Sequence, residues 1–337
     1  MPYIALILGV LLLPLTSVQA DYLKLGVIVP LSGPASLMGE SLSGVVKLAK
    51  LTRVSAELED DRCEAKTALS AYHKLRGRGV RIFYMACSGS ILAVAPLAKR
   101  NGDLILTSYA GSAKIRDTKA EVLRFNPDAI SIANKLSQLL VEDLKPAIVI
   151  FEEQDYAQSL ADRLQELLGS SIIEKISYRP DATSFASEVV RIKQLKGQSI
   201  ILIPTSDGAA QRMLRAFSSG GVTTPIIGEV NLCDFPFSPS DFGLHGFCVS
   251  ARFSGEAFES FIHDFQAQVG RPSAYPFYDA IALDLLRQLD KIAANYQEPD
   301  SVRAKLLEGF SGRFADYSLT NDGEVQNGGD YLTVVRY

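Results

Sequence analysis

Compact apolar segments alternate with segments of helical periodicity along most of the chain. The runs Leu23 to Pro30 (LKLGVIVP), Ala147 to Phe151 (AIVIF) and Ser199 to Ile203 (SIILI) are mostly apolar, which is typical of strands buried on both faces of a parallel sheet. Segments between such runs, for example Ser41 to Leu51, carry small and apolar residues at helical spacing. This alternation predicts an α/β fold with parallel sheets.

The segment Arg81 to Ser112 shows the pattern most clearly. It contains an expected strand (Arg81 to Met85), a small polar elbow (Ala86 to Ser90), an Ala-rich helix, and a second strand (Leu104 to Leu106) that ends in another small polar elbow. A strand, a helix and a parallel strand form a right-handed crossover, so the two elbows should lie side by side at the carboxyl edge of the sheet. Open α/β sheets bind their ligands at that edge.

The first elbow is a candidate binding site. Ser88 stands where the helix begins, so its hydroxyl group and the free N–H groups of Gly89 and Ser90 are placed to hold a carboxylate or carbonyl oxygen. Ser and Gly are also ordinary capping residues at a helix start, and this alternative stays open. A nucleophilic serine is disfavoured, because Ala86 and Ser90 stand where a hydrolase elbow requires glycine.

The first twenty residues have the pattern of a leader. Met1 to Ala20 is an apolar run without a charged side chain, and it ends in small residues before Asp21. This predicts a secretory signal peptide. A membrane anchor is the weaker interpretation, because Pro14 interrupts a short apolar core.

Length and charge narrow the class of the mature protein. About 317 residues follow the leader, which exceeds one comfortable core, so two domains are expected. The net charge of −4 argues against nucleic acid as a partner. No later apolar run is long enough to span a bilayer, so we expect no stable membrane insertion after the signal is cleaved.

The chain contains four cysteines, and an even count in an exported protein favours disulfides. Their order suggests that Cys63 pairs with Cys87 and Cys233 with Cys248, although the sequence leaves the connectivity open. A metal site is disfavoured, because neither pair has C-x-x-C spacing and the three histidines stand apart. We therefore expect no metal.

Several segments together resemble a known family. The segments are VIVPLSGPASLMGE, ELEDDRCEAKTA, CSGSILAVAPLA followed by LILTSYAGSAKIRD, FEEQDYAQSLADRL and the YDAIALDLL stretch from Tyr278. They are similar to the branched-chain amino-acid-binding proteins of ABC importers, and the likeness covers most of the chain after Asp21. The resemblance implies the type I periplasmic-binding fold, with two doubly wound, Rossmann-like domains joined by a hinge of several strands.

The resemblance also implies where the chain passes between the domains. Relatives cross just after Phe125, at Asn126-Pro127, and Phe247 to Phe253 is expected to cross back. The expected lobes are residues 21–125 with about 253–317, and residues 126–252 with about 318–337. In relatives the loop from Ala35 to Glu40 touches the ligand, and Met38 stands at about that position.

By the same resemblance, residues from both lobes would bind the ligand. Ser88, Gly89, Tyr109 and Gly111 would hold its carboxylate side, and Tyr156, Ser206 and Glu229 would complete the other wall. Glu229 is the expected partner of an α-ammonium group, with Asn231 as the alternative, and the ring of Tyr156 would cover an aliphatic ligand. Glu152 and Glu153 are expected to be solvated acids of a first helical turn.

Three positions depart from the amino-acid binders. Gly111 stands where many members have Thr, Tyr109 is bulkier than the usual small residue, and Ser206 stands where an aromatic residue is common. These departures bear on the ligand and leave the expected fold unchanged.

The resemblance implies a periplasmic protein that captures a small polar ligand, amino-acid or amide-like, by hinge closure. The protein is expected to be a monomer and to deliver the ligand to the permease subunits of an ABC importer. The alternative is a periplasmic ligand-sensing module on the same fold that reports to a receptor or a cell-wall enzyme. An enzyme is disfavoured, because the chain has no zinc-binding H-E-x-x-H, no Walker loop and no G-x-G-x-x-G. No cofactor is expected.

Overall fold

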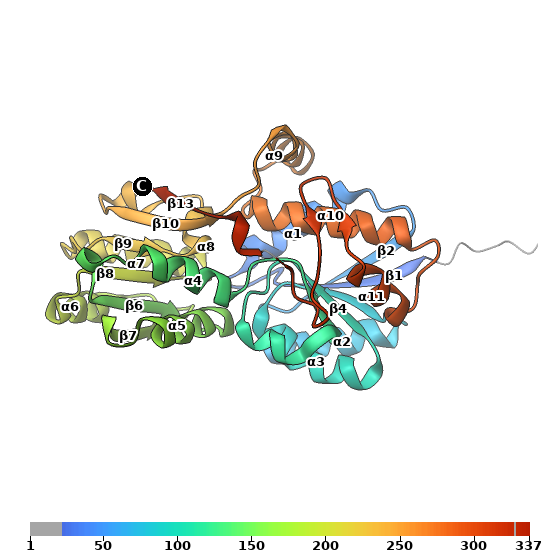
Figure 1. Cartoon of the computed structure of the whole chain (residues 1–337), viewed down its shortest axis with the longest axis horizontal. Coiled ribbons are helices and arrows are strands. Elements are labelled where there is room, and N and C mark those ends of the chain that lie inside the picture. The colour runs from blue at the N-terminus through green and yellow to red at the C-terminus, as the bar shows by residue number, and fades with distance from the viewer. Residues whose placement is uncertain (1–21, 327) are drawn as a thin grey trace, which may run out of the picture.

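The computed structural model describes residues 22–326 and 328–337. These residues form two α/β halves that lie side by side, each built around its own sheet (Figure 1). The predicted signal peptide, Met1 to Ala20, lies outside the described residues. Within the described part of the chain, every helix is too short or too polar to cross a membrane. The predicted α/β class with mainly parallel sheets is confirmed.

The first half, lobe 1, contains a five-stranded parallel sheet of order β2-β1-β3-β4-β5. Its strands are β1 (Leu23–Val29), β2 (Val54–Asp60), β3 (Ile82–Met85), β4 (Leu104–Thr107) and β5 (Val122–Arg124). The helices between them are α1 (Ser36–Ala49), α2 (Ala65–Gly77) and α3 (Ser88–Asn101). All residues of β3 and β4 are buried, as their continuous apolar sequences predict.

The second half, lobe 2, contains a six-stranded sheet of order β13-β10-β9-β8-β6-β7, in which β13 alone runs antiparallel to its neighbour. Its strands are β6 (Ala147–Glu152), β7 (Ile172–Tyr178), β8 (Ser199–Ile203), β9 (Ile226–Gly228), β10 (Gly246–Ala251) and β13 (Leu332–Arg336). Its helices are α4 (Ala129–Leu139), α5 (Asp155–Leu168), α6 (Ala186–Leu195), α7 (Asp207–Ser219) and α8 (Val230–Asp234).

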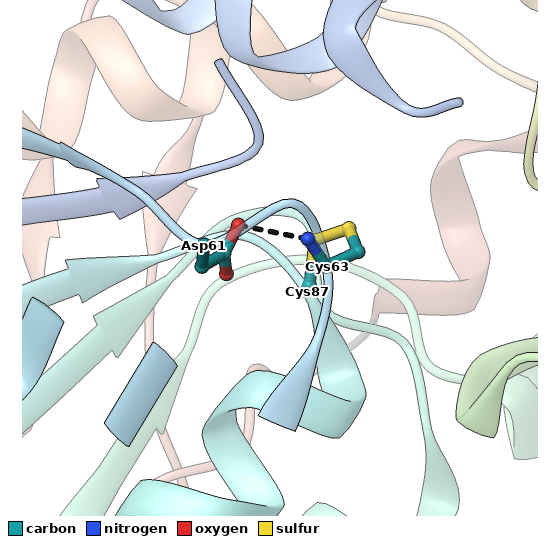
Figure 2. Close-up of side chains that lie close together, drawn as sticks. All are labelled: Asp61, Cys63 and Cys87. Atoms are coloured by element: carbon teal, nitrogen blue, oxygen red, sulfur yellow. Dashed lines mark hydrogen bonds between the residues drawn. A yellow bond between two sulfur atoms is a disulfide. The ribbon is translucent and has the colours of Figure 1, made fainter. Parts of the chain in front are cut away.

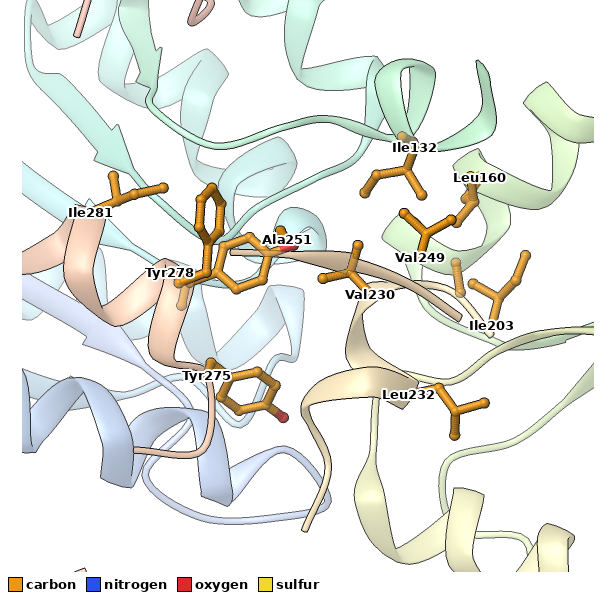
Figure 3. Packing of buried hydrophobic residues seen from close by; sticks show 14 of the residues in the cluster. Ile132, Leu160, Ile203, Val230, Leu232, Val249, Ala251, Tyr275, Tyr278 and Ile281 are labelled. Atoms are coloured by element: carbon orange, nitrogen blue, oxygen red, sulfur yellow. The ribbon is translucent and has the colours of Figure 1, made fainter. Parts of the chain in front are cut away.

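After β10 the chain returns to lobe 1. It adds α9 (Glu256–Val269), α10 (Pro276–Ile292), α11 (Pro299–Leu307) and a hairpin of β11 (Phe310–Ser311) and β12 (Asp316–Tyr317). Helices α9 and α10 pack against α1. Figure 3 shows Tyr275 and Tyr278, which lie at the start of α10, near Val230 and Leu232 of lobe 2. One cluster of buried apolar residues therefore extends across the boundary between the lobes.

Most of the segment that was expected to cross between the lobes, Phe247 to Phe253, belongs to strand β10, in which Phe247 to Ala251 pairs with β13. The chain leaves lobe 2 after this strand, at the end of the expected segment. One predicted helix boundary was wrong. Helix α1 was expected to begin at Ser41 after a loop, but it begins at Ser36, so Met38 lies in its first turns.

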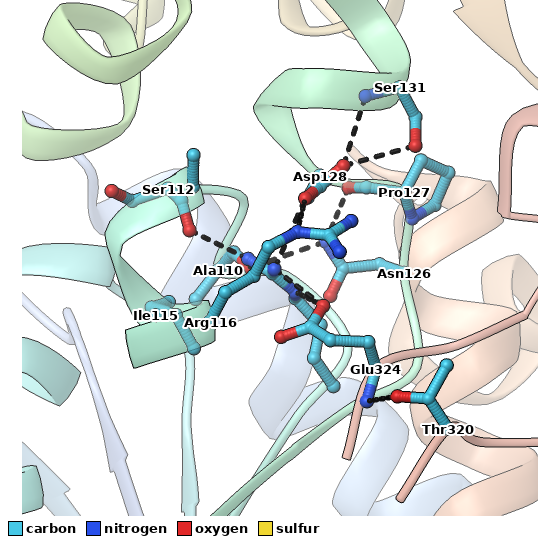
Figure 4. A network of polar contacts seen from close by, with 12 residues as sticks. Ala110, Ser112, Ile115, Arg116, Asn126, Pro127, Asp128, Ser131, Thr320 and Glu324 are labelled. Atoms are coloured by element: carbon cyan, nitrogen blue, oxygen red, sulfur yellow. Dashed lines mark hydrogen bonds and ion pairs between the residues drawn. The ribbon is translucent and has the colours of Figure 1, made fainter. Parts of the chain in front are cut away.

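A buried ion network joins the segments that connect the lobes (Figure 4). Arg124, at the end of β5, donates to Glu324 of the segment between β12 and β13, with distances of 2.8 Å from Nε and 2.5 Å from Nη2 to Oε2. Its Nη2 also lies 3.3 Å from Asp128, which caps α4 of lobe 2. Arg116 donates to Asp128 at 2.7 Å. Arg124, Asp128 and Glu324 are buried, while the side chain of Arg116 is 44% exposed, so the network compensates three buried charges from inside and from the surface.

The guanidinium group of Arg124 is fully satisfied. It also donates to the carbonyl oxygens of Ala110 at 3.5 Å and Ser112 at 2.7 Å, which belong to the second elbow of lobe 1. Burial by itself would raise the pKa of Asp128, but the two arginines lower it below its ordinary value. The hinge is therefore tied directly to the loop that borders the interlobe space.

Both suggested disulfides are present. Cys63 and Cys87 are bonded, with a Cα–Cα distance of 5.4 Å, and Cys233 is bonded to Cys248, with a Cα–Cα distance of 5.9 Å. The first bond fastens the loop after β2 to the elbow before α3. Figure 2 shows this bond next to Asp61, whose carboxylate accepts the N–H of Cys63 at 3.0 Å.

Candidate functional site

A cavity of about 70 Å³ lies between the two lobes. The carboxyl edges of both sheets contribute to its wall, because parallel strands leave their following loops at the same edge. Five of the seven predicted binding residues line it: Ser88, Gly89, Tyr109, Gly111 and Tyr156. Ser206 and Glu229 do not line it and lie behind the wall of lobe 2.

Ser88 connects the two elbows of lobe 1. It is the first residue of α3, and its hydroxyl oxygen accepts the N–H of Ser112 at 3.1 Å. Among the described residues nothing accepts the hydroxyl hydrogen of Ser88, so this O–H group is available to a ligand in the cavity.

Two glycines allow the lobes to approach closely. A Cβ atom on Gly89 would lie 2.6 Å from Oδ2 of Asp155, and one on Gly111 would lie 2.7 Å from Cε2 of Tyr156. Both distances are shorter than van der Waals contact. The absence of a side chain at Gly111, one of the departures from the amino-acid binders, therefore makes room for the ring of Tyr156.

Tyr109 connects the cavity to a buried carboxylate. Its ring lies 5.2 Å from the ring of Tyr278 between centroids, and its hydroxyl group donates to Asp279 at 2.5 Å. Asp279 also accepts from the hydroxyl groups of Ser41 and Ser273. Burial raises the pKa of Asp279 to about 6, although these three hydrogen bonds act to lower it.

The equivalent arrangement in lobe 2 joins Tyr156 to Glu229. The hydroxyl group of Tyr156 donates to Glu229 at 2.7 Å, and the N–H of Asn231 donates to the same carboxylate at 3.0 Å. Glu229 is fully buried, and burial raises its pKa to about 8. Asn231, the alternative ammonium partner, does line the cavity, and its amide group donates to the carbonyl of Pro204 at 3.0 Å.

Glu152 is the largest correction to the sequence prediction. It was expected to be a solvated acid, but it is buried at the last position of β6 and lines the cavity. Its carboxylate accepts from the backbone and side chain of Thr205, at 3.1 and 2.7 Å, and of Ser206, at 3.0 and 2.8 Å. Ser206 is therefore turned toward Glu152, and the negative charge is held at the amino end of α7.

The sequence reasoning did not select several other lining residues, among them Gln154, Asp155, Thr205 and Tyr278. Thr205 and Asp155 carried a usable signal, because each lies next to a selected residue in an elbow at the sheet edge. Tyr278 reaches the cavity from α10, far from the elbows in sequence; the family resemblance implied only that it faces the hinge.

One group of side chains has the composition of a metal site. Asp61, Cys63 and Cys87 lie within reach of a single ion, but the two sulfur atoms are bonded to each other (Figure 2). A disulfide offers no thiolate to a metal. The group is therefore a structural clasp beside the cavity.

Comparisons with known proteins agree on the fold. Residues 23–311 match the family model described as periplasmic binding protein. No curated protein sequence matches the chain. Among solved structures, a type 1 periplasmic binding protein from Bordetella pertussis is similar with a TM-score of 0.81 and 18% identity, over 94% of this chain and 97% of that one.

Several similar structures contain ligands, among them two with ligands of different classes. One is an ABC transporter solute-binding protein from Rhodopseudomonas palustris in complex with 3,4-dihydroxybenzoic acid (TM-score 0.79, 16% identity, 94% of this chain and 93% of that one). The other is a branched-chain amino acid transporter substrate-binding protein from Streptococcus pneumoniae in complex with isoleucine (TM-score 0.77, 16% identity, 94% and 100%). At these identities the likeness shows the fold alone.

Proposed function

The chain belongs to the periplasmic binding protein family, and we propose that it captures a small polar solute, amino-acid or amide-like, in the cavity between its lobes. The lobes close on the solute, and the loaded protein delivers it to the permease subunits of an ABC importer. The observation that carries this proposal is the cavity itself, whose wall contains residues from both lobes.

Hinge closure is the physical basis of the proposal. A ligand stabilises the closed form only if it contacts both lobes at once, because binding energy shifts the equilibrium toward the form with more contacts. Ser88 and Gly89 on one side and Tyr156 and Asn231 on the other are separated by the cavity. A ligand of a few heavy atoms would touch all four.

Each predicted binding residue has a proposed role. Ser88 donates a hydrogen bond, Tyr109 and Tyr156 provide rings, and Gly89 and Gly111 permit close approach of the lobes. Ser206 and Glu229 act from behind the wall: Ser206 fixes Glu152, and Glu229 fixes the hydroxyl group of Tyr156.

We further propose that Met1 to Ala20 directs export to the periplasm and that the mature protein acts as a monomer. The two lobes that move are residues 21–125 with about 253–317, and residues 126–252 with about 318–337. The protein is a carrier and not an enzyme in this proposal. Four of the similar structures are complexes with aromatic acids and one is a complex with isoleucine, so the ligand class needs a separate argument.

A thermal-shift screen of the mature chain against amino acids, amides, amines and small aromatic acids tests the proposal. At least one compound should raise Tm, and Ser88→Ala should reduce that shift. Substitution of Gln198, which follows α6 at the opposite end of lobe 2, should leave the shift unchanged. A compound whose stabilisation is insensitive to Ser88→Ala and to Asn231→Ala would place its site elsewhere.

A further inference from the structure

The wall of the interlobe cavity is rich in carboxylates. Glu152 and Asp155 line it, and Glu229 and Asp279 lie behind it, each bonded to the hydroxyl group of a tyrosine whose ring lines the cavity. Among the described lining residues Arg62 is the one cationic side chain; it is 52% exposed and pairs with a neighbouring glutamate at 3.4 Å. Three of these four carboxyl groups are buried, whereas the side chain of Asp155 is 43% exposed and the positive charge lies at the solvent-exposed rim.

A carboxylate of lobe 2 approaches the place best suited to a ligand carboxylate. The amino end of α3 has free N–H groups, no acidic residue in its first turn and no side-chain cap, which favours a negative group there. Oδ2 of Asp155, from lobe 2, lies so close that a Cβ on Gly89 would be 2.6 Å from it, and its Oδ1 lies 4.0 Å from Nζ of Lys114. Asp155 therefore places a negative group beside this helix end, where it would repel a ligand carboxylate.

The remaining surface of the cavity suits a cation. The rings of Tyr109, Tyr156 and Tyr278 line it, and the face of a phenol ring attracts a positive charge. Tyr278 is 5% exposed, and its hydroxyl group has no hydrogen-bond partner among the described residues, although the residue lines the cavity. This hydroxyl group is therefore available to a ligand in the cavity, to which it can donate or accept a hydrogen bond.

Among the described residues, the groups with the largest effects on the pKa of Glu229 include no cation. Tyr156 is hydrogen-bonded to Glu229. The other titratable groups that interact electrostatically with Glu229 are Glu152, Asp234, Tyr178, Tyr275 and Tyr278. All of these are acids. A positive charge brought into the cavity would therefore favour the ionised form of Glu229, while a negative charge would be repelled.

We propose that the cavity is selective for a small organic cation, a protonated amine without a carboxylate, held between Tyr278 of lobe 1 and the wall formed by Tyr156, Glu152 and Asn231 of lobe 2. This inference rests on the proposed capture of a small polar solute between the lobes, and it replaces the amino-acid or amide-like ligand with an amine. An amine needs no partner at the amino end of α3, so Asp155 stays in place when the lobes close.

Four probes that share an isopropyl group test the effect of ligand charge directly. Isobutylamine carries an ammonium group alone, and valine carries both an ammonium group and a carboxylate. 3-Methylbutanoate carries a carboxylate alone, and 3-methylbutanamide carries no charge. Their effects on Tm and their affinities by calorimetry are compared at pH 7. The affinity for isobutylamine should be at least about tenfold higher than the affinity for 3-methylbutanoate. Its binding should also release a proton from Glu229, so the measured heat should differ between phosphate and Tris buffers.

Three variants connect the result to the proposed groups. Glu229→Gln should lower the affinity for isobutylamine by about tenfold and abolish the dependence of the binding heat on the buffer. Glu153→Gln is the matched control, since it removes an exposed carboxylate next to Glu152. It should change neither the affinity for isobutylamine nor the dependence of the heat on the buffer. Asp155→Asn should improve the binding of 3-methylbutanoate, because it removes the competing anion at α3.

The outcomes separate the inference from the proposed function. If 3-methylbutanoate or valine stabilises the protein and isobutylamine does not, the cation inference is overturned and solute binding remains supported. If no probe changes Tm or produces binding heat, the cation inference is overturned, and the proposed function is decided by the wider thermal-shift screen. An amine effect that is equal in wild type and Glu229→Gln also overturns the inference, because the buried carboxylate would then have no part in selection.

Discussion

The backbone of Gly111 faces the ring of Tyr156 so closely that a Cβ atom would lie 2.7 Å from Cε2. Gly111 belongs to an elbow of lobe 1, and Tyr156 belongs to the first turn of α5 in lobe 2. This contact depends on the absence of a side chain, so it reports directly on the approach of the two lobes.

Gly111→Val should therefore hinder closure while leaving each lobe folded. Overpacking of this kind costs about 1–3 kcal/mol, and only the closed form would bear that cost. We expect an increase of at least about tenfold in the Kd of any cavity ligand, measured by calorimetry, with little change in the Tm of the free protein. Gly77→Ala is the control, because a Cβ there meets nothing within 4 Å. An unchanged Kd for Gly111→Val would contradict this account of closure.

The hinge network predicts a strong effect of Arg124. Arg124→Met leaves the carboxylates of Glu324 and Asp128 buried with less compensation, and breaking a buried ion pair in this way lowers the free energy of unfolding by about 3–5 kcal/mol. Urea denaturation measures the loss. The double variant Arg124→Met, Glu324→Leu should recover part of it, because the unpaired charge is removed as well. Additive effects of the two substitutions would show that the pair does not couple the hinge segments.

The raised pKa of Glu229 predicts a dependence of stability on pH. Its pKa is about 8 in the folded protein against an ordinary value of 4.5, so the folded state binds the proton more tightly than the unfolded state. The wild type should therefore lose stability as the pH rises from about 4.5 through about 8. Glu229→Gln should remove this loss, so its advantage in unfolding free energy grows from pH 5 to pH 9. A constant difference between the two proteins over this range would be inconsistent with a raised pKa.

Reduction of the disulfides should destabilise the mature protein. Cys63–Cys87 and Cys233–Cys248 close loops with sequence separations of 24 and 15 residues, and loop closure of this size contributes about 3 kcal/mol in the chain-entropy model. Chemical denaturation with and without a reducing agent measures the sum. Replacing Cys63 and Cys87 by Ala should also weaken ligand binding, because that disulfide lines the cavity. Loss of the other disulfide should affect stability alone.

The sequence was a good guide to the fold for a physical reason. Strands such as β3 and β8 are apolar at every position and short, so both their type and their burial follow from the pattern. Elbows with Ser88 and Gly111 follow two such strands, and a parallel sheet brings them to one edge. Helix boundaries were less predictable: α1 begins at Ser36, earlier than expected, because the small and polar residues there fit a first turn as well as a loop.

The orientation of side chains at the site could not be predicted. Whether Ser206 faces a ligand or Glu152 depends on a carboxylate from another strand, and two backbone N–H groups of the elbow decide it. Glu229 was selected for its charge, but its separation from the cavity by Tyr156 is a property of packing between α5 and α8. The position of Asp155 next to Tyr156 in an elbow could have suggested it as a lining residue, but its approach to α3 of lobe 1 depends on how the lobes pack together.

Hydrogen exchange with and without a stabilising ligand tests the central claim most directly, because it reports on both lobes in one experiment. If the lobes close on a ligand between them, amide protection should increase in residues 86–90 and 108–112 of lobe 1 and, together with them, in residues 153–157 and 229–232 of lobe 2. Protection confined to one lobe, or located away from these elbows, would contradict the account.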